Sequence, residues 1–209
     1  LKTKNAVFDI QFGHLSRSTG NKTKIEKARW EVCGQKWVDM SNGKFGAAII
    51  TDCKYGFRAK NNVLDLNLLR ATIHPGKEGD IGTRHIRYAF YVHEGDHNQG
   101  EVEWQATVFN TWFPIYNGSR LNESLLSISE KNIQYSTIKT AEDENSIIIR
   151  LYEFTGKQTS CKVHFNIAGK CEIKETNLVE ENEKNVGQSS DCTLNFAPFE
   201  IKTLKIIQV

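Results

Sequence analysis

The sequence predicts an all-β fold, and three observations support this prediction. Apolar and polar residues alternate along many short segments. In Val63-Leu64-Asp65-Leu66-Asn67-Leu68, for example, the leucines share one face of a half-buried strand. Turn-forming groups such as Ser41-Asn42-Gly43 and His74-Pro75-Gly76 separate these segments. Roughly a dozen short strands at this spacing are typical of β-sandwiches.

The predicted strands lie, in chain order, wherever this alternation or a short apolar run is bounded by turn signals. They cover residues 7–12, 29–38, 45–51, 63–69, 84–93, 133–139, 147–153, 163–167, 171–179, 192–196 and 199–207. The polar stretch 180–185 is expected to be an exposed loop.

One segment, residues 100–113, has helical rather than strand spacing. Its apolar positions recur at three or four residues: Val102, Ala106, Phe109 and Phe113. Asn98 is the expected N-cap, and Pro114 prevents continuation of the helix. We therefore expect a short helix and a polar linker, residues 116–124, between a first and a second β-unit.

Charge and composition exclude several classes of function. The chain has 27 Lys and Arg against 25 Asp and Glu, so its formal net charge is only +2. This balance argues against nucleic acid as a partner, because a phosphate backbone is usually met by a clustered basic excess. Apolar runs such as Ala47-Ala48-Ile49-Ile50 are far shorter than the about 20 residues that cross a bilayer. We therefore expect neither nucleic acid nor a membrane among the partners.

The five cysteines and the start of the chain favour a cytoplasmic protein. The cysteines are Cys33, Cys53, Cys161, Cys171 and Cys192. They are odd in number and contain no CxxC pair, so we interpret them as thiols in a reducing compartment. The chain begins at Leu1 without an initiator methionine or a signal peptide, and we expect it to be a piece of a longer protein.

The most prominent local motif is His93-Glu94-Gly95-Asp96-His97, which matches HExxH. In a zinc protease, the two histidines would bind the metal from one face of a helix and Glu94 would be the general base. Here the residues before His93 alternate as in a strand, and Gly95 disfavours a helix. We therefore expect no metal site at this motif.

Other catalytic arrangements have weaker support in the sequence. Cys53 lies between Asp52 and Lys54, and His85 or His93 could serve as its base, but the sequence does not place a base beside the thiol. There is no G-x-S-x-G elbow, Walker loop or dinucleotide fingerprint. Sugar-stacking surfaces could come from the tryptophans, although core packing is their more frequent use. These are Trp30, Trp37, Trp104 and Trp112.

Segments distributed over nearly the whole chain resemble the α-mannosidases of glycoside hydrolase family 38, in the order of that family. They include Asp9-Ile10-Gln11-Phe12-Gly13, Asp52-Cys53-Lys54-Tyr55-Gly56 and Leu68-Leu69-Arg70. Further matching segments are residues 14–19, 28–32, 36–39, 62–64, 88–93, 139–143, 149–153 and 198–204. The Asp-Cys-Lys-Tyr-Gly form is similar to the cytosolic and bacterial branch.

The resemblance implies the family's C-terminal β portion. Residues 1–115 would be the latter part of a mutarotase-like supersandwich with a terminal helix, and residues 116–209 a smaller C-terminal β-sandwich. The family's zinc ligands, aspartate nucleophile and acid/base carboxylate belong to an N-terminal catalytic domain that no segment here matches. The resemblance therefore implies no catalytic residue, no metal ligand and no cofactor in this chain, and zinc in the catalytic domain of the parent.

The resemblance also implies one residue in the sugar pocket. Arg70 matches an arginine that reaches this pocket from the β portion, where its guanidinium would donate to sugar oxygens. Without the resemblance, Arg70 is equally well a charge at a solvated strand end. The loop after the 45–51 strand supplies candidates for a domain interface: Asp52, Lys54 and Tyr55.

The leading functional hypothesis is the C-terminal β portion of a retaining α-mannosidase, which would support the catalytic domain and the pocket wall and be inactive alone. Its partners would be the N-terminal catalytic domain, a mannoside and, through an uncovered apolar surface, a second copy in a homo-oligomer. Two alternatives belong to other classes: an autonomous carbohydrate-binding β-sandwich, and a purely structural assembly module.

Overall fold

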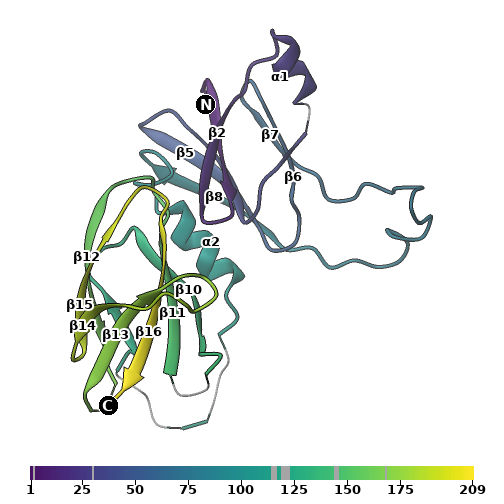
Figure 1. The fold of residues 1–209 in the computed structure, drawn as a ribbon. Helices are drawn as coiled ribbons and strands as arrows, with labels where there is room; N and C mark the ends of the chain where they lie inside the picture. Colours follow the sequence, from purple (N-terminus) through teal and green to yellow (C-terminus); the bar gives the residue numbers. More distant parts are fainter. Residues whose placement is uncertain (2, 30, 114–116, 119–122, 144–145, 168) are drawn as a thin grey trace. The chain divides into compact units, whose positions relative to one another are not determined.

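The computed structural model contains two compact units, Leu1–Ile115 and Tyr116–Val209 (Figure 1). It describes residues 1, 3–29, 31–113, 117–118, 123–143, 146–167 and 169–209. Both units are built mainly from antiparallel strands, so the predicted all-β fold class is confirmed. No helix in the described residues is long and apolar enough to cross a membrane.

The first unit contains a five-stranded antiparallel sheet and a smaller three-stranded one. The large sheet has the order β2-β1-β4-β5-β8, and the small sheet has the order β3-β6-β7. The strands of the large sheet are β1 (Asn5–Ile10), β2 (Gly13–Ser18), β4 (Trp37–Ser41), β5 (Phe45–Thr51) and β8 (Tyr88–Glu94). Those of the small sheet are β3 (Val32–Cys33), β6 (Gly56–Lys60) and β7 (Val63–Leu66).

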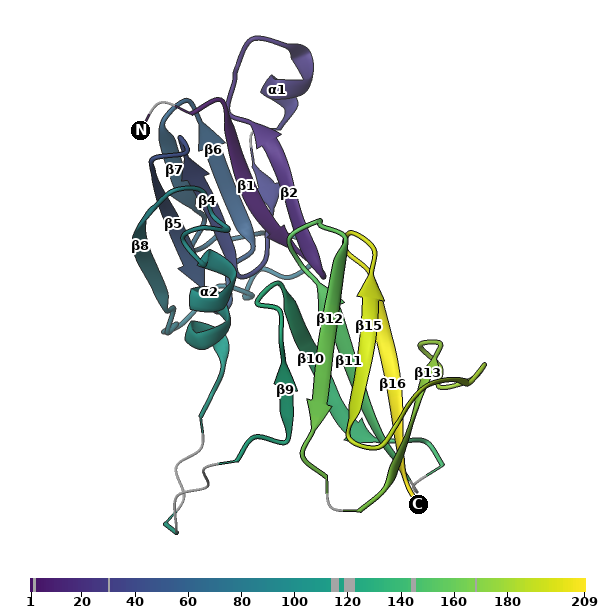
Figure 2. The same ribbon diagram turned by 90° about the vertical axis from the view of Figure 1, so that its left-hand side faces the viewer.

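The large sheet buries side chains on both of its faces. One face packs on the small sheet through a core of Ala6, Phe8, Val38, Met40 and Phe57. The other face packs on helix α2 (Val102–Asn110), which Figure 2 shows against the sheet, through a core of Trp37, Ala48, Ile50, Val102 and Ala106. Because successive side chains of a strand point to opposite faces, neighbouring residues of one strand enter different cores.

The predicted helix is present as α2 but is shorter than residues 100–113, and its predicted cap is wrong. The N-cap is Glu101 in a left-handed conformation, with φ of 52° and no side-chain cap bond. Asn98 instead lies in the preceding turn, where Asp96 Oδ1 accepts from the backbone N–H groups of Asn98 and Gln99. Pro114 and most of the predicted linker 116–124 lie outside the described residues.

A second helix, α1 (Lys24–Ala28), was not expected from the sequence. It is only five residues long, and a capping box fixes its start. Thr23 accepts from the backbone N–H of Glu26, while the Glu26 carboxylate accepts from the backbone N–H of Thr23. The signal T-x-x-E is therefore present in the sequence, but no apolar period accompanies so short a helix.

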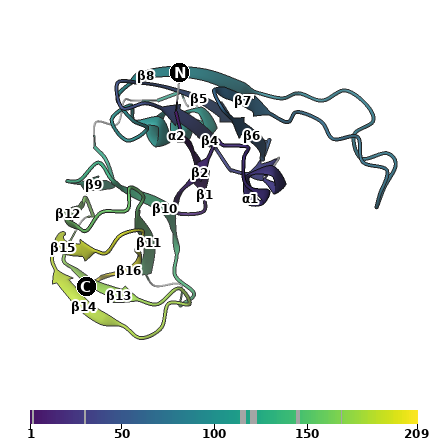
Figure 3. The same ribbon diagram turned by 90° about the horizontal axis from the view of Figure 1, so that it is seen from above.

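Residues 67–87 form an arm between β7 and β8 that contains no helix or strand. Figures 1 and 3 show it projecting from the strands of the first unit. The predicted strands 63–69 and 84–93 therefore extend too far: β7 ends at Leu66 and β8 begins only at Tyr88. Asn67 donates its backbone N–H to Gly56 O at 2.9 Å, which holds the start of the arm beside β6.

The second unit is a two-sheet sandwich with one core. Its sheets have the orders β10-β11-β16-β13-β14 and β15-β12-β9. The strands are β9 (Leu126–Ile128), β10 (Ile133–Thr140), β11 (Ser146–Glu153), β12 (Thr159–Phe165), β13 (Cys171–Thr176), β14 (Lys184–Gln188), β15 (Asp191–Phe196) and β16 (Ile201–Gln208). Alternate residues such as Cys161, Val163 and Phe165 of β12 point into this core.

The differences from the predicted strands have local causes. The predicted strand 29–38 is two strands, β3 and β4, because Gly34 and Gln35 bond across to Tyr55 and Asp9 rather than continuing one ladder. β2, β6, β9 and β14 were not predicted as strands. β14 begins within the predicted loop 180–185, since an edge strand with one partner tolerates polar residues on both faces.

Candidate functional site

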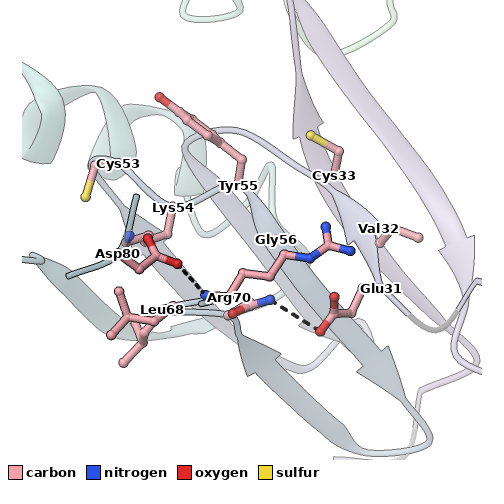
Figure 4. A pocket seen from close by; sticks show the side chains of 12 residues that line it. Glu31, Val32, Cys33, Cys53, Lys54, Tyr55, Gly56, Leu68, Arg70 and Asp80 are labelled. Carbon is pink, nitrogen blue, oxygen red and sulfur yellow. Dashed lines mark hydrogen bonds between the residues drawn. The ribbon is translucent and has the colours of Figure 1, made fainter. Parts of the chain in front are cut away.

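Three of the four candidate residues lie together around one cavity of the first unit. Arg70, Lys54 and Tyr55 line a cavity of about 430 Å³ (Figure 4). The other lining residues are Glu31, Val32, Cys33, Cys53, Gly56, Asn67, Leu68, Leu69 and Asp80. The cavity is thus bounded by β3, by the loop between β5 and β6, and by the arm.

The fold brings these distant segments together through the small sheet. Gly34 donates its backbone N–H to Tyr55 O at 3.1 Å, which ties the end of β3 to the loop before β6. The β6–β7 hairpin then returns the chain to Gly56, where Asn67 is bonded. As a result, residues 31–33, 53–56 and 67–70 surround the same space.

Arg70 is held by its backbone, and its side chain extends across the cavity. Asp80 Oδ2 accepts from the N–H of Arg70 at 3.3 Å and from the N–H of Ala71 at 2.5 Å. Ala71 has a φ of 50°, so the chain turns sharply beside this carboxylate. Figure 4 shows the guanidinium directed toward Glu31. Among the described residues it has no ion-pair or hydrogen-bond partner.

Asp52 and Tyr55 line a second, smaller hollow of about 190 Å³, together with Gln35, Lys36, Thr51 and Asn110. Asp52 Oδ2 pairs with Arg87 Nε at 3.1 Å, and Arg87 also donates to Phe109 O at 2.8 Å. Asp52 is therefore engaged within its own unit. Tyr55, whose side chain is more than half exposed, borders both hollows.

The HExxH residues are committed to structural contacts. His93 lies in β8, and its Nε2 is 2.8 Å from Asp39 Oδ2 in a fully buried pair. Gly46 and Gly100 make room for the imidazole, because a Cβ at either position would lie within 2.2 Å of the ring. His97 lies beyond the strand, with its ring near those of His14 and Trp37. Burial and the neighbouring His14 lower the pKa of His97 to about 4.

The HExxH residues do not have the geometry of a zinc site. The described residues contain no group of three or more His, Cys, Asp or Glu side chains that could hold a metal ion. His93 and His97 are not one helical turn apart on one face, as the motif would require, because β8 ends at Glu94. We therefore derive no chemical step from a metal in this chain.

Cys53 does not have the environment of a nucleophile. A hydrogen bond with Asp52, followed by slight desolvation and the charge of that carboxylate, raises the pKa of the exposed Cys53 thiol. A reactive thiol needs the opposite shift, toward the thiolate. Cys53 thus remains protonated near neutral pH.

The tryptophans differ in environment. Trp37 is buried and donates its Nε1–H to Glu103 Oε2 at 2.7 Å. Glu103 also pairs with Lys36, and the Lys36 backbone donates to the buried Asp9 at 2.8 Å. Desolvation raises the pKa of Asp9 to about 7. Trp112 is 82% exposed, Trp104 is half-buried, and Trp30 lies outside the described residues.

Sequence reasoning did not place Glu31, Cys33 or Asp80 in the cavity that Arg70 lines. Glu31 lies in the matching segment 28–32 and Cys33 follows it, but neither they nor Asp80 had a pattern that assigned them to a cavity. These residues reach the cavity because of the β6–β7 hairpin and the bend of the arm. No local sequence pattern predicts that these segments meet.

Two family models match the chain. The model described as the glycosyl hydrolases family 38 C-terminal domain matches residues 1–78, and the family 38 C-terminal beta sandwich domain matches residues 132–204. Alpha-mannosidase G of Dictyostelium discoideum is 33% identical over 99% of this chain and 20% of its own length. Alpha-mannosidase 2C1 of Mus musculus is 32% identical over 99% of this chain and 21% of its own length.

A solved structure has a similar fold. It is an alpha-mannosidase from Enterococcus faecalis V583, with a TM-score of 0.77 and 17% identity over 98% of this chain and 24% of that chain. The present chain thus spans about a fifth of the length of the curated relatives that it matches.

Proposed function

Because the chain belongs to the C-terminal region of glycosyl hydrolase family 38, we propose that it is the C-terminal β portion of an α-mannosidase. The parent enzyme would hydrolyse terminal α-mannosides with retention of configuration. Residues 1–115 would form the latter part of a supersandwich and residues 116–209 the terminal sandwich. The described chain would support an N-terminal catalytic domain and contribute one wall of its pocket. The names of the relatives and their length support this proposal.

The observation that carries the proposal is the Arg70 side chain in the cavity of about 430 Å³. Its guanidinium extends across the cavity without a partner among the described residues, so its donors are free for sugar hydroxyl oxygens. Tyr55 provides an exposed ring at the same cavity, and such rings pack on the apolar faces of sugars. Lys54 and Asp52 would border the contact with the catalytic domain.

The carboxylates of this cavity do not make it a catalytic centre. Retaining glycosidases use two carboxyl groups about 5–5.5 Å apart, one as nucleophile and one as acid/base. Asp80 already accepts two backbone N–H groups, and Glu31 accepts from Asn67 Nδ2 at 3.4 Å. The nucleophile, the acid/base and the zinc ion would therefore come from the catalytic domain of the parent.

Replacement of Arg70 tests the proposed sugar contact. In the complete enzyme, we expect Arg70→Ala to lower kcat/KM for an aryl α-mannoside about 10- to 100-fold, because a charged hydrogen bond is lost. The kcat/KM of Arg70→Lys should lie between those of the wild type and Arg70→Ala, since lysine keeps the charge but lacks the planar guanidinium group. Lys77→Ala, on the same arm but outside the cavity, is the matched control and should leave the kinetics unchanged. Unchanged turnover in Arg70→Ala would exclude the contact.

The isolated 209-residue chain should be inactive. We expect no release of aryl leaving group from an α-mannoside by the purified chain, with or without added zinc. Hydrolysis that persists through purification and is abolished by a substitution in this chain would refute the assignment of catalysis to another domain.

An autonomous carbohydrate-binding module is the second candidate, and the exposed Tyr55 ring favours it. Titration calorimetry of the 209-residue chain with mannosides separates the two proposals. Saturable heat that disappears in Tyr55→Ala would support the binding module. Absence of heat, together with loss of activity in Arg70→Ala of the complete enzyme, would support the pocket wall.

For the parent enzyme we also propose a cytoplasmic location, which fractionation of the source cells would test.

A further inference from the structure

β8, which lies at the edge of the large sheet (Figure 2), carries an exposed apolar strip. Tyr88, Phe90 and Val92 of β8 are 58%, 72% and 63% exposed, and Phe45 at the start of β5 is 55% exposed. We call these four residues the β8 strip. The exposed side chains are large, and three of them are aromatic.

The register of the sheet places the whole strip on one face. Phe45 pairs with Glu94, and Val92 pairs with Ala47, so these residues point to the same side of the sheet. Phe90 pairs with Ile49, which packs against the core between the two sheets. The strip therefore continues that core past the region covered by the small sheet.

The opposite face of β8 is already covered. Ala89 and Tyr91 pack against the core beneath α2, and His93 is buried beside Asp39. β8 is thus apolar on both faces, a pattern typical of a strand buried in the interior rather than one at a sheet edge. It also lacks the devices that protect natural edges, since Glu94 is its only charged residue apart from the buried His93.

We propose that the polypeptide preceding this chain in the parent α-mannosidase packs on the β8 strip and forms a permanent apolar interface there. This inference rests on the proposed function. The matched family models are described as C-terminal, and the chain spans about a fifth of its relatives, so most of each relative precedes the matched region. Large exposed aromatic side chains with a single charge, Glu94, at one end are characteristic of obligate interfaces, whose centres are depleted of charge.

Chemical accessibility tests the interface without risk of misfolding. Val92→Cys is introduced with Cys33→Ser and Cys53→Ser, which remove the two exposed thiols. We expect a maleimide to label Cys at position 92 rapidly in the 209-residue chain and at least tenfold more slowly in the complete enzyme. Ser136→Cys, an exposed position in the second unit, is the matched control for reagent access. Equal rates at position 92 in the two proteins would overturn the proposal.

A stability measurement is the second test of the interface. Phe90→Thr with Val92→Thr places β-branched side chains, which suit a strand, at both positions and removes the apolar surface. We expect a lower unfolding midpoint in the complete enzyme and an unchanged midpoint in the 209-residue chain. Ile25→Thr, an exposed change on α1, should alter neither. If the double variant fails to fold in the complete enzyme alone, that selective failure also supports the interface.

The alternative occupant is a second copy of the chain. A complete enzyme whose subunits separate on introduction of Phe90→Thr and Val92→Thr, with stability unchanged, would assign the strip to an oligomer contact and overturn the proposal. Failure of this proposal can be distinguished from failure of the proposed function. Protection at position 92 in an enzyme that does not hydrolyse mannosides would leave the interface standing and refute only the proposed activity.

Discussion

Glu153 shows how one buried carboxylate can organise a unit. It is fully buried at the end of β11, and six donors converge on its two oxygens. They are Asn132 Nδ2, the backbone N–H and hydroxyl of Thr155, and the backbone N–H groups of Gly156, Lys157 and Phe199. The carboxylate thereby joins the 155–157 turn to the segment before β16.

Replacing Glu153 with Gln should destabilise the second unit by about 3 kcal/mol, because the amide NH₂ leaves backbone donors without an acceptor. Burial raises the pKa of Glu153, but the bonds from Thr155, Phe199 and Asn132 outweigh it, so the pKa lies below its usual 4.5. The ionised form therefore stabilises the folded state at any pH above the unfolded pKa, and this contribution is lost as the pH falls through the folded pKa.

Urea unfolding at several pH values measures this prediction. The difference in unfolding free energy between wild type and Glu153→Gln should be largest near about pH 7 and shrink below about pH 4. Glu130→Gln, an exposed position in the same unit, is the control. A difference that stays constant across this range would contradict the role of the ionised carboxylate.

At the scale of the element, the arm 67–87 decides where Arg70 lies. The arm has no ladder bonds, so the carboxylate of Asp80 takes their place by accepting from two backbone groups beside Arg70. Arg84 adds a bond to Gly79 O at 2.8 Å on the same side of the arm. The position of the arginine thus depends on a few side-chain contacts rather than on a strand.

Replacing Asp80 with Ala should therefore reduce activity without reducing stability. In the complete enzyme, we expect kcat/KM to fall about 3- to 10-fold through a higher KM. The reason is that the Asp80 carboxylate no longer accepts from the backbone N–H groups that position Arg70. Asp80→Asn keeps an acceptor oxygen and should recover most of the loss. A fall in the unfolding midpoint that parallels the fall in activity would point to a structural role instead.

The same elements show how far the sequence leads. β5 matches its predicted range, 45–51, because an apolar run lies between clear turn signals on both sides. The predicted strands around the arm were too long, because Leu68, Leu69 and Arg84 continue the local pattern without a partner strand. Arg70 and Tyr55 were selected by family resemblance. Their shared cavity was not predictable, since it depends on a hairpin and a bend that only long-range contacts fix.

At the scale of the molecule, each unit has hydrophobic cores of its own. The second unit has a single core of thirteen buried side chains from both of its sheets, including Ile133, Leu151, Phe165 and Leu204. The first unit divides its buried residues between two smaller cores, one on each face of the large sheet. The thirteen described side chains of this core all come from the second unit itself.

We expect residues 123–209, expressed alone, to unfold in one cooperative transition. Residues 1–115 alone should have a lower free energy of unfolding than residues 123–209, because the β8 strip remains uncovered. Circular dichroism during heating and amide exchange along β11 and β16 measure both expectations. A broad, non-cooperative transition for residues 123–209 would mean that the second core is insufficient by itself.

The arm has a consequence for divergence between relatives. Because residues 67–87 contribute to neither sheet of their unit, insertions, deletions and substitutions there leave both ladders intact. Under the proposed function, the wall that faces the sugar can change around Arg70 and Asp80 without disturbing either sheet of the first unit. New glycoside preferences could then arise by reshaping one surface segment, while selection for foldability acts on the strands alone.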